Sequence, residues 1–204
     1  MIDKTQIPYL GVLLTKKDTD VFTPYSLPEG YQFCSYETGL ELEWVKLNML
    51  FEVFESFAQA ISYFQTVFLT NPELTNKQLL FVKDASGGVV ATACLWEGMH
   101  FGVAVQRIQF LAIHPFHRNK GISKAMISKL LEVYQDKQYQ TGIYVSTQTW
   151  SFAEINLFFM FGFVAYTGPK PPRWNGTAEQ FDYNKNIAWK IIRDNIGVRT
   201  HETL

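Results

Sequence analysis

Apolar residues recur at helical spacing in the first third of the chain. Between positions 40 and 54 they stand in steps of three and four residues, at Leu40, Trp44, Leu47, Phe51 and Phe54. Steps of this size put side chains on one face of a helix, so the spacing predicts a helix over 40–54. A second helix is predicted over 57–69, and it ends before Asn71-Pro72 because proline rarely continues a helix.

Shorter apolar runs bounded by turn residues predict strands. They cover 9–14, 31–36, 78–83, 89–96, 105–113, 142–147 and 163–167. The Gly87-Gly88 pair marks a hairpin turn. Further helices are predicted over 121–135, 152–161 and 187–195. An antiparallel meander followed by strand, helix, strand, helix and strand predicts a mixed α/β sheet with one parallel crossover region.

Composition and charge narrow the class of protein. The chain has 204 residues, 47% hydrophobic and 18% charged, which favours one folded domain. Lysine and arginine total 18 and acidic residues 19, for a net charge of −1, so no global positive field would hold nucleic acid or an anionic membrane. Two cysteines, Cys34 and Cys94, exclude a disulfide framework and a four-cysteine metal site.

The sequence shows neither a recognisable targeting signal nor several common nucleotide-binding and hydrolase motifs. The first residues lack the pattern of a signal peptide, and the most apolar stretch, 155–166, is too short to span a bilayer. We therefore expect a cytoplasmic protein. The motifs of nucleoside triphosphate loops, dinucleotide folds, serine hydrolases and zinc proteases are missing as well.

The segment between the strand 105–113 and the helix 121–135 carries the candidate chemistry. A tight turn that opens a helix points free backbone N–H groups outward at the positive end of the helix dipole, which suits an anion. Gly121 lets the backbone approach a ligand closely. Arg118, Lys120 and Lys124 oppose the dipole unless an anion is bound there. The alternative is a solvated basic turn that merely begins a helix.

Residues 111–125 resemble the acyl-CoA-binding motif of the GNAT N-acetyltransferase superfamily, which is Gln/Arg-x-x-Gly-x-Gly/Ala after a strand. A second match follows, since the strand 142–147 and the helix ending at Gly162-Phe163 resemble the later part of that family. The resemblance covers 31–167. It leaves 1–30 as an N-terminal extension with an extra strand and 168–204 as a C-terminal loop and helix packed on the same domain.

The resemblance implies a fold and a reaction. The fold would be a mainly antiparallel sheet flanked by helices, with a parallel, splayed strand pair at the acyl-CoA site. The reaction would transfer acetyl from acetyl-CoA to a primary amine by direct attack in a ternary complex, without a metal. The acceptor would be a small molecule or a peptide, with neither nucleic acid nor membrane as partner, and a homodimer is left open.

Cofactor contacts carry over from the family position by position. The backbone of Leu111, Ala112 and Ile113 would hold the pantetheine arm. Backbone N–H groups of the turn would hold the pyrophosphate, at Arg118, Asn119, Lys120, Gly121, Ile122 and Ser123. Ser123 replaces the usual glycine or alanine and is small enough to fit. Ser151 stands where many relatives have an asparagine that contacts the pantetheine.

The catalytic positions depart from the family pattern. Phe158 stands where relatives often have a tyrosine that protonates the thiolate. Arg107 and Gln109 stand where a glutamate or histidine base is common, and neither suits a base. Glu97 and His100, after the strand 89–96, are the candidate bases, with an ordinary surface turn as the alternative. Tyr144 and Tyr166 are interpreted as packing residues.

These departures keep two other functions open. One is a GNAT-like module that binds acyl-CoA with little or no catalytic activity. The other is an α/β domain whose helix N-terminus binds a different phosphate ligand. Residues 170–174 are interpreted as a subunit contact or a lid over the acceptor.

Overall fold

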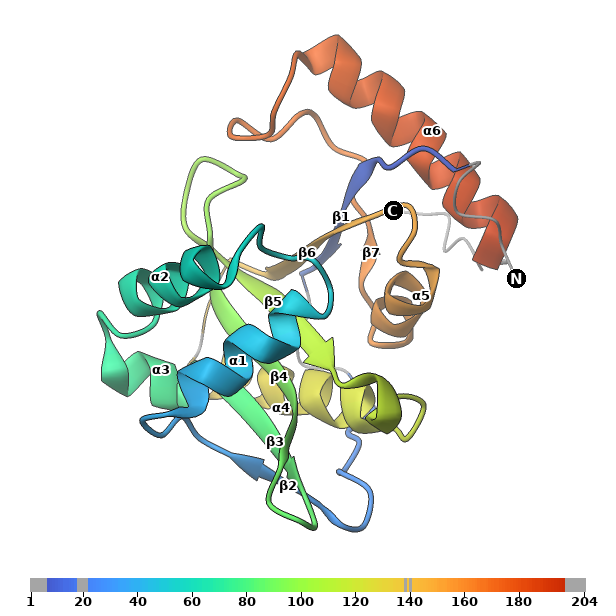
Figure 1. The fold of residues 1–204 in the computed structure, drawn as a ribbon. Coiled ribbons are helices and arrows are strands. Elements are labelled where there is room, and N and C mark those ends of the chain that lie inside the picture. The colour runs from blue at the N-terminus through green and yellow to red at the C-terminus, as the bar shows by residue number, and fades with distance from the viewer. Residues whose placement is uncertain (1–6, 18–21, 138, 140, 197–204) are drawn as a thin grey trace. The chain divides into compact units, whose positions relative to one another are not determined.

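The computed structural model describes residues 7–17, 22–137, 139 and 141–196. The described strands are β1 (Gly11–Lys16), β2 (Tyr31–Cys34), β3 (Leu79–Asp84), β4 (Val89–Gly98), β5 (Val105–Ile113), β6 (Ile143–Gln148) and β7 (Val164–Ala165). The described helices are α1 (Leu40–Met49), α2 (Phe57–Val67), α3 (Pro72–Gln78), η2 (Pro115–His117, a 3₁₀ turn), α4 (Ile122–Asp136), α5 (Phe152–Met160) and α6 (Ala178–Ile196). Figure 1 shows this succession along the chain. No described helix is long and apolar enough to cross a membrane.

The strands join into one sheet in the order β2-β3-β4-β5-β6-β1-β7. β5 and β6 are parallel and pair at Gln106 with Ile143 and at Arg107 with Tyr144, near the start of both strands. The pairs β2–β3, β3–β4, β1–β6 and β1–β7 are antiparallel. This confirms the expected mixed, mainly antiparallel α/β sheet with one parallel pair.

The chain divides into two compact units. The first unit comprises residues 1–22, 97–107 and 140–204, and the second comprises 23–96 and 108–139. The cut between the two units falls inside β5, so Val105–Arg107 belong to the first unit and Ile108–Ile113 to the second.

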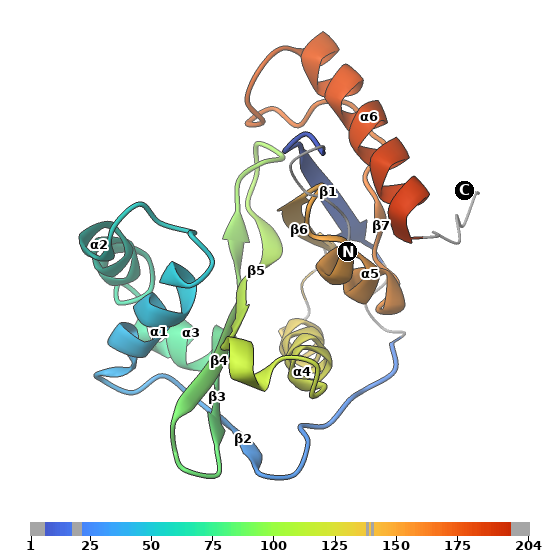
Figure 2. The same cartoon turned by 45° about the vertical axis from the view of Figure 1, so that its right-hand side comes forward.

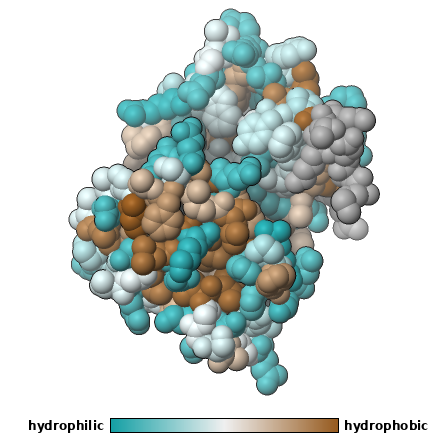
Figure 3. Space-filling model, viewed as in Figure 1, coloured by the Kyte–Doolittle hydropathy of each residue, from teal (hydrophilic) through white to brown (hydrophobic). Residues whose placement is uncertain are grey.

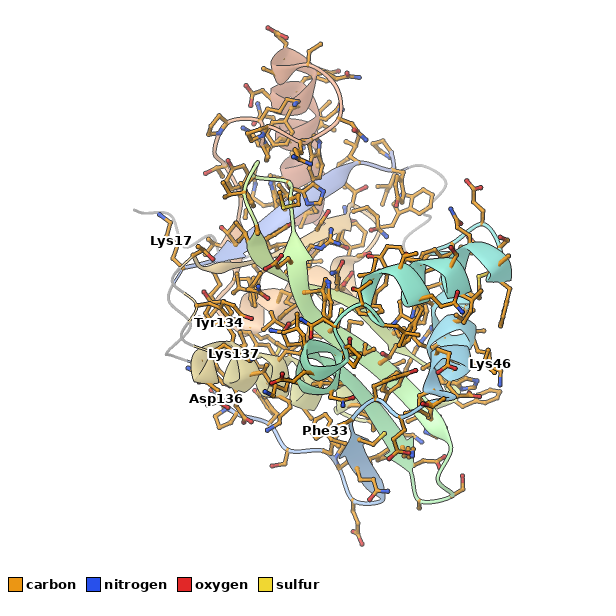
Figure 4. The ribbon with its side chains drawn as sticks, turned by 90° about the vertical axis from the view of Figure 1, so that its left-hand side faces the viewer. Lys17, Phe33, Lys46, Tyr134, Asp136 and Lys137 are labelled. Carbon is orange, nitrogen blue, oxygen red and sulfur yellow. The ribbon has the colours of Figure 1, made fainter. Side chains whose placement is uncertain are left out.

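The second unit is built around an aromatic core beneath α1 and α2. Helices α1, α2 and α3 lie on one side of β3 and β4, and α4 lies on the other (Figure 2). Figure 4 gives the same arrangement, with Lys46 of α1 on one side and Tyr134 of α4 on the other. Trp44 is fully buried, and its ring centroid lies 5.0 Å from Phe110 and 5.3 Å from Phe64.

The first unit holds the three strands β6, β1 and β7 together with α5 and α6. β1 runs antiparallel to β6, from Gly11 opposite Gln148 to Lys16 opposite Ile143. Its middle, from Val12 to Leu14, is buried. Helices α5 and α6 lie beside each other in Figures 1 and 2 and meet through the rings of Phe159 and Trp189, 6.3 Å apart.

The prediction for the end of the first helix was wrong. α1 ends at Met49, and the chain then turns back on itself, with Val53 N–H bonded to the Asn48 carbonyl and Glu52 at φ 55°. Phe54 still packs against Trp44, at 5.5 Å between ring centroids, but from this turn. Apolar spacing thus placed Trp44 and Leu47 correctly on the buried face of α1, whereas Phe51 is exposed in the turn after the helix.

Other element boundaries also differ from the predictions. α3 was missed because Asn71-Pro72 reads as a helix stop, whereas the Asn71 side chain caps the Leu74 N–H and Pro72 opens the new helix. α6 begins at Ala178, nine residues before the predicted start. β7 covers only Val164–Ala165 of the predicted strand 163–167.

Candidate active site

The turn after β5 contains two residues with left-handed backbone angles. η2 ends at His117, Arg118 is extended, and Asn119 and Gly121 have left-handed φ angles of 61° and 89°. Such angles favour glycine and tolerate asparagine. Together they redirect the chain from the strand into α4, which starts at Ile122.

The N-terminus of α4 has no side-chain cap and no acidic residue in its first turn. Its N-cap residue is Gly121, and the Ala125 N–H bonds to the Gly121 carbonyl at 3.2 Å. The N–H groups of Ile122, Ser123 and Lys124 precede that bond and therefore lack an intrahelical acceptor. Their positive partial charge suits phosphate oxygens.

Three cations surround this helix end, and each rests on an aromatic ring. The Arg118 guanidinium lies 4.9 Å from the Phe51 ring centroid. Ammonium groups lie over two tyrosines, Lys120 at 5.9 Å from Tyr31 and Lys124 at 5.1 Å from Tyr25. The rings hold the cations in place through cation–π attraction without neutralising them. Nothing in the local sequence marks these rings, because they lie far from the turn along the chain.

The turn is tied to its surroundings by further polar contacts in the second unit. The Tyr31 hydroxyl meets His117 Nδ1 at 2.9 Å and accepts from Lys120 Nζ at 3.2 Å. A shallow cleft of about 410 Å³ opens beside it, lined by Tyr25, Tyr31 and Ala125 among others. This part of the second unit therefore combines uncapped N–H groups, fixed cations and open space.

The predicted pantetheine segment lies in β5. Ala112 is buried, while Leu111 and Ile113 are half-buried. Arg118 Nε donates to the Ile113 carbonyl at 3.3 Å. Phe110 has φ 56°, a left-handed angle that is costly for a bulky residue, and its ring packs into the Trp44 core. This kink in β5 was not predicted, because the aromatic core that holds it forms only in the folded chain.

A second cluster forms around His100 in the first unit. His100 is half-buried in the loop after β4, and its Nδ1 lies 2.9 Å from the Tyr144 hydroxyl. Arg107 hydrogen-bonds the same hydroxyl. The parallel pairing of Arg107 with Tyr144 puts both side chains on one face of the sheet, which brings this triad together.

The electrostatics of this cluster favour a neutral imidazole. Burial lowers the pKa of His100, and the positive charge of Arg107 lowers it further. Burial raises the pKa of Tyr144, against the opposing effect of Arg107. The phenol oxygen has acceptor capacity for both Arg107 and a protonated Nδ1 of His100. In that tautomer the Nε2 lone pair of His100 is available to take a proton.

Two other features hold His100 in position. A Cβ atom on Gly98 would lie 1.8 Å from the Tyr144 hydroxyl, so only glycine leaves room for that phenol. The His100 carbonyl accepts from Arg173 N–H at 3.0 Å, and the Trp174 ring lies 5.3 Å from the His100 ring. The segment 170–174, predicted as a subunit contact or lid, thus packs against His100 within the same unit.

The remaining predicted residues are spread along β4 and α5. Glu97 is exposed near the end of β4. Ser151 is the N-cap residue of α5, and its hydroxyl bonds to Glu154. Phe158 is fully buried against Phe163, at 5.1 Å between ring centroids. Among the described residues, no group of three or more histidine, cysteine or acidic side chains is placed to hold a metal.

Two partners of His100 went unrecognised in the sequence. Tyr144 was interpreted as packing, and Arg107 was noted only as unsuited to be a base. Tyr144 is the hydrogen-bond partner of His100, and Arg107 acts on His100 through its positive charge. The alternation of β6 marks Tyr144 as a strand residue, but its partner depends on register, which no local pattern encodes.

The family model for the acetyltransferase (GNAT) family matches residues 44–163, more than half of the chain. The chain belongs to the GNAT acetyltransferase family. The match includes the turn 118–123, His100, Tyr144 and all of α5, and it ends before the segment 170–174. Members of this family transfer an acyl group from acetyl-CoA to an amine. No curated protein matches the chain.

Solved structures share this fold at low sequence identity. A GCN5-related N-acetyltransferase from Sphaerobacter thermophilus has TM-score 0.59 and 18% identity, with 80% of this chain and 51% of that chain covered. A spermidine N-acetyltransferase mutant from Vibrio cholerae has TM-score 0.51 and 18% identity, with 67% and 81% covered. A glucosamine-6-phosphate N-acetyltransferase from Arabidopsis thaliana has TM-score 0.50 and 11% identity, with 72% and 100% covered. The chain thus spans about half the length of the Sphaerobacter protein.

Proposed function

We propose that this GNAT protein transfers acetyl from acetyl-CoA to a primary amine by direct attack in a ternary complex. The observation that carries the proposal is the uncapped N-terminus of α4, surrounded by Arg118, Lys120 and Lys124. Without an anion these charges oppose the helix dipole, so the arrangement becomes favourable only when a ligand such as a pyrophosphate is bound.

The cofactor would be held mainly by backbone groups. N–H groups of residues 118–123 would bind the pyrophosphate, and the backbone of 111–113 would pair with the pantetheine arm. The Arg118 bond to the Ile113 carbonyl would then be exchanged for a contact with the cofactor. Ser151 would contact the pantetheine, as the family asparagine does.

The proposed chemistry begins with attack of the amine nitrogen on the thioester carbonyl carbon. His100 would accept the proton that the amine loses, because its lowered pKa keeps the imidazole neutral. Glu97 is the alternative base and would act from an exposed position. Binding both reactants in one complex supplies much of the rate enhancement, since the attack becomes effectively unimolecular.

The acceptor is proposed to be a small-molecule or peptide amine. Figure 3 shows apolar surface gathered over the region that α1 covers in Figure 1. Exposed apolar side chains of α1, of the following turn and of the first residue of α2 include Leu42, Leu50, Phe51, Val53 and Phe57. A first screen should therefore include 2-phenylethylamine, which matches the apolar surface. It should also include spermidine and glucosamine 6-phosphate, the two amines named for the structural neighbours.

Replacing Gly121 with glutamate is expected to abolish CoA binding. The new carboxylate would stand at the helix end proposed for the pyrophosphate and repel it. With CoA present at 100 times its dissociation constant, the free energy of unfolding of wild-type protein should rise by about 2.7 kcal/mol. This corresponds to a rise in melting temperature of several degrees. The variant should show no rise with acetyl-CoA or CoA in a thermal-shift measurement.

Gly87→Glu is the matched control for this experiment. Gly87 has φ 84°, close to the 89° of Gly121, and a Cβ at either glycine meets nothing within 4 Å. The backbone strain of the two variants is therefore comparable, and only one lies at the proposed site. A folded wild-type protein that ignores CoA would contradict the proposal. Binding of CoA without turnover of any amine would favour the acyl-CoA-binding module, and equal stabilisation by ATP would favour another phosphate ligand.

A further inference from the structure

The proposed reaction releases a thiolate, and the family position for its proton donor is occupied by Phe158. That side chain is fully buried and has no proton to give. The C–S bond breaks more readily when the sulfur is protonated as it leaves. A substitute donor would have to lie close to the same face of α5.

Glu154 lies one helical turn before Phe158 on α5. Residues four apart in a helix share one face, so the two side chains are neighbours along it. Glu154 is half-buried, and the Thr147 hydroxyl on β6 donates to its carboxyl at 2.8 Å. Ser151, the residue expected to contact the pantetheine, hydrogen-bonds the same carboxyl.

The surroundings of Glu154 favour the protonated form of its carboxyl. Burial raises its pKa, and the hydrogen bonds from Thr147 and Ser151 only partly oppose this effect. Lys16 on β1 is a cation, but it lies at the other end of α5. Its Nζ would be 3.1 Å from a Cβ atom added to Gly162. On α6, Lys185 is bonded to Asp182 and to backbone carbonyls.

We propose that Glu154 is the catalytic acid that protonates the sulfur of CoA in place of the missing tyrosine. This inference rests on the proposed function. The amine nitrogen bonds to the acetyl carbon and loses a proton to His100, the proposed base. The C–S bond breaks, and its electron pair moves to sulfur. Sulfur takes the proton from the Glu154 carboxyl, which gives CoA thiol and a carboxylate. The N-terminal turn of α5 stabilises that carboxylate until it is reprotonated from solvent.

The test compares two leaving groups in wild-type protein and Glu154→Gln. Acetyl-CoA releases a thiolate, whereas the acetyl selenoester of seleno-coenzyme A releases a more acidic selenol that needs little protonation. Hydroxylamine serves as the acceptor because it is small. With acetyl-CoA, the variant should lose about 100-fold in kcat, at the low end for acid catalysis because a thiolate leaves easily. With the selenoester the loss should nearly disappear.

Glu179→Gln is the control, since Glu179 also lies in the first turn of a helix but is exposed. It should leave both rates unchanged. An equal loss with the two esters, or no loss with acetyl-CoA, would overturn the role of Glu154. Amine turnover by wild-type protein is scored separately and decides the proposed function.

A binding measurement tests Glu154 even if no acceptor is turned over. The pKa of the CoA thiol, followed by thiolate absorbance in the bound complex, should fall in Glu154→Leu, because Glu154 is a carboxylate at the pH where a thiol ionises and its negative charge disfavours a neighbouring thiolate. A thermal shift with CoA confirms that the variant is folded and loaded. An unchanged thiol pKa in the loaded variant would overturn the proposal.

Discussion

Replacing His100 with glutamine is expected to lower kcat for acetyl transfer by about 100-fold to 10,000-fold, the range for loss of a general base. Glutamine retains a polar group for the Tyr144 hydroxyl but cannot take a proton from the attacking amine. CoA binding should be unchanged, because the proposed phosphate contacts come from residues 118–123. Steady-state kinetics with the best amine of the screen, together with a thermal shift with CoA, measure the two effects separately.

The pH dependence of the reaction gives a sharper test of the same base. A base works in its neutral form, so the rate should fall as pH drops through the lowered pKa of His100. Arg107→Gln removes a positive charge that lowers this pKa. The acidic limb of the kcat/KM profile should therefore move to higher pH in that variant. The acceptor amine titrates identically in both proteins, so the difference between the profiles belongs to the enzyme.

Glu97→Gln discriminates between the two candidate bases. Glu97 is exposed, and its loss should change the rate by less than about threefold if His100 is the base. A large loss in Glu97→Gln with normal activity in His100→Gln would reverse the assignment. An acidic limb that stays in place in Arg107→Gln would also contradict the role given to His100.

The backbone course of the turn 118–123 could be predicted because its information is local. A strand, a turn with glycine at a left-handed position and an amphipathic helix follow one another within about 30 residues. Such local order leaves traces in residue spacing and in turn chemistry. Gly121 has a left-handed φ of 89°, which glycine adopts without strain, although glycine was expected there because it lets the backbone approach a ligand closely.

The parts that could not be predicted depend on contacts between distant residues. His100 and Tyr144 are 44 positions apart and meet because of strand register and the room left by Gly98. The helical spacing wrongly predicted a helix as far as Phe54 for a related reason. An apolar side chain can pack against Trp44 from a turn as well as from a helix. The Asn71-Pro72 sequence is compatible both with the end of one helix and with the N-cap of the next. In the folded protein it is the N-cap of α3.

Gly98→Ala is expected to destabilise the fold by about 3 kcal/mol, at the upper end for overpacking in a filled site. The added Cβ would lie 1.8 Å from the Tyr144 hydroxyl and 2.7 Å from Cζ of the same ring. Tyr144 is fully buried and cannot swing into solvent, so the strand ends or the ring must shift. Urea denaturation should show a lower midpoint with an unchanged slope.

The same substitution should also reduce acetyl transfer in the protein that remains folded. Moving the phenol breaks its hydrogen bond to His100 Nδ1 and frees the imidazole to rotate. Gly88→Ala is the control, because a Cβ there meets its nearest neighbour at an ordinary 3.5 Å. If Gly98→Ala matched this control in both stability and rate, the phenol would not fill the space beside Gly98. The geometry on which the proposed base role of His100 rests would then fail as well, because the position of His100 depends on that phenol.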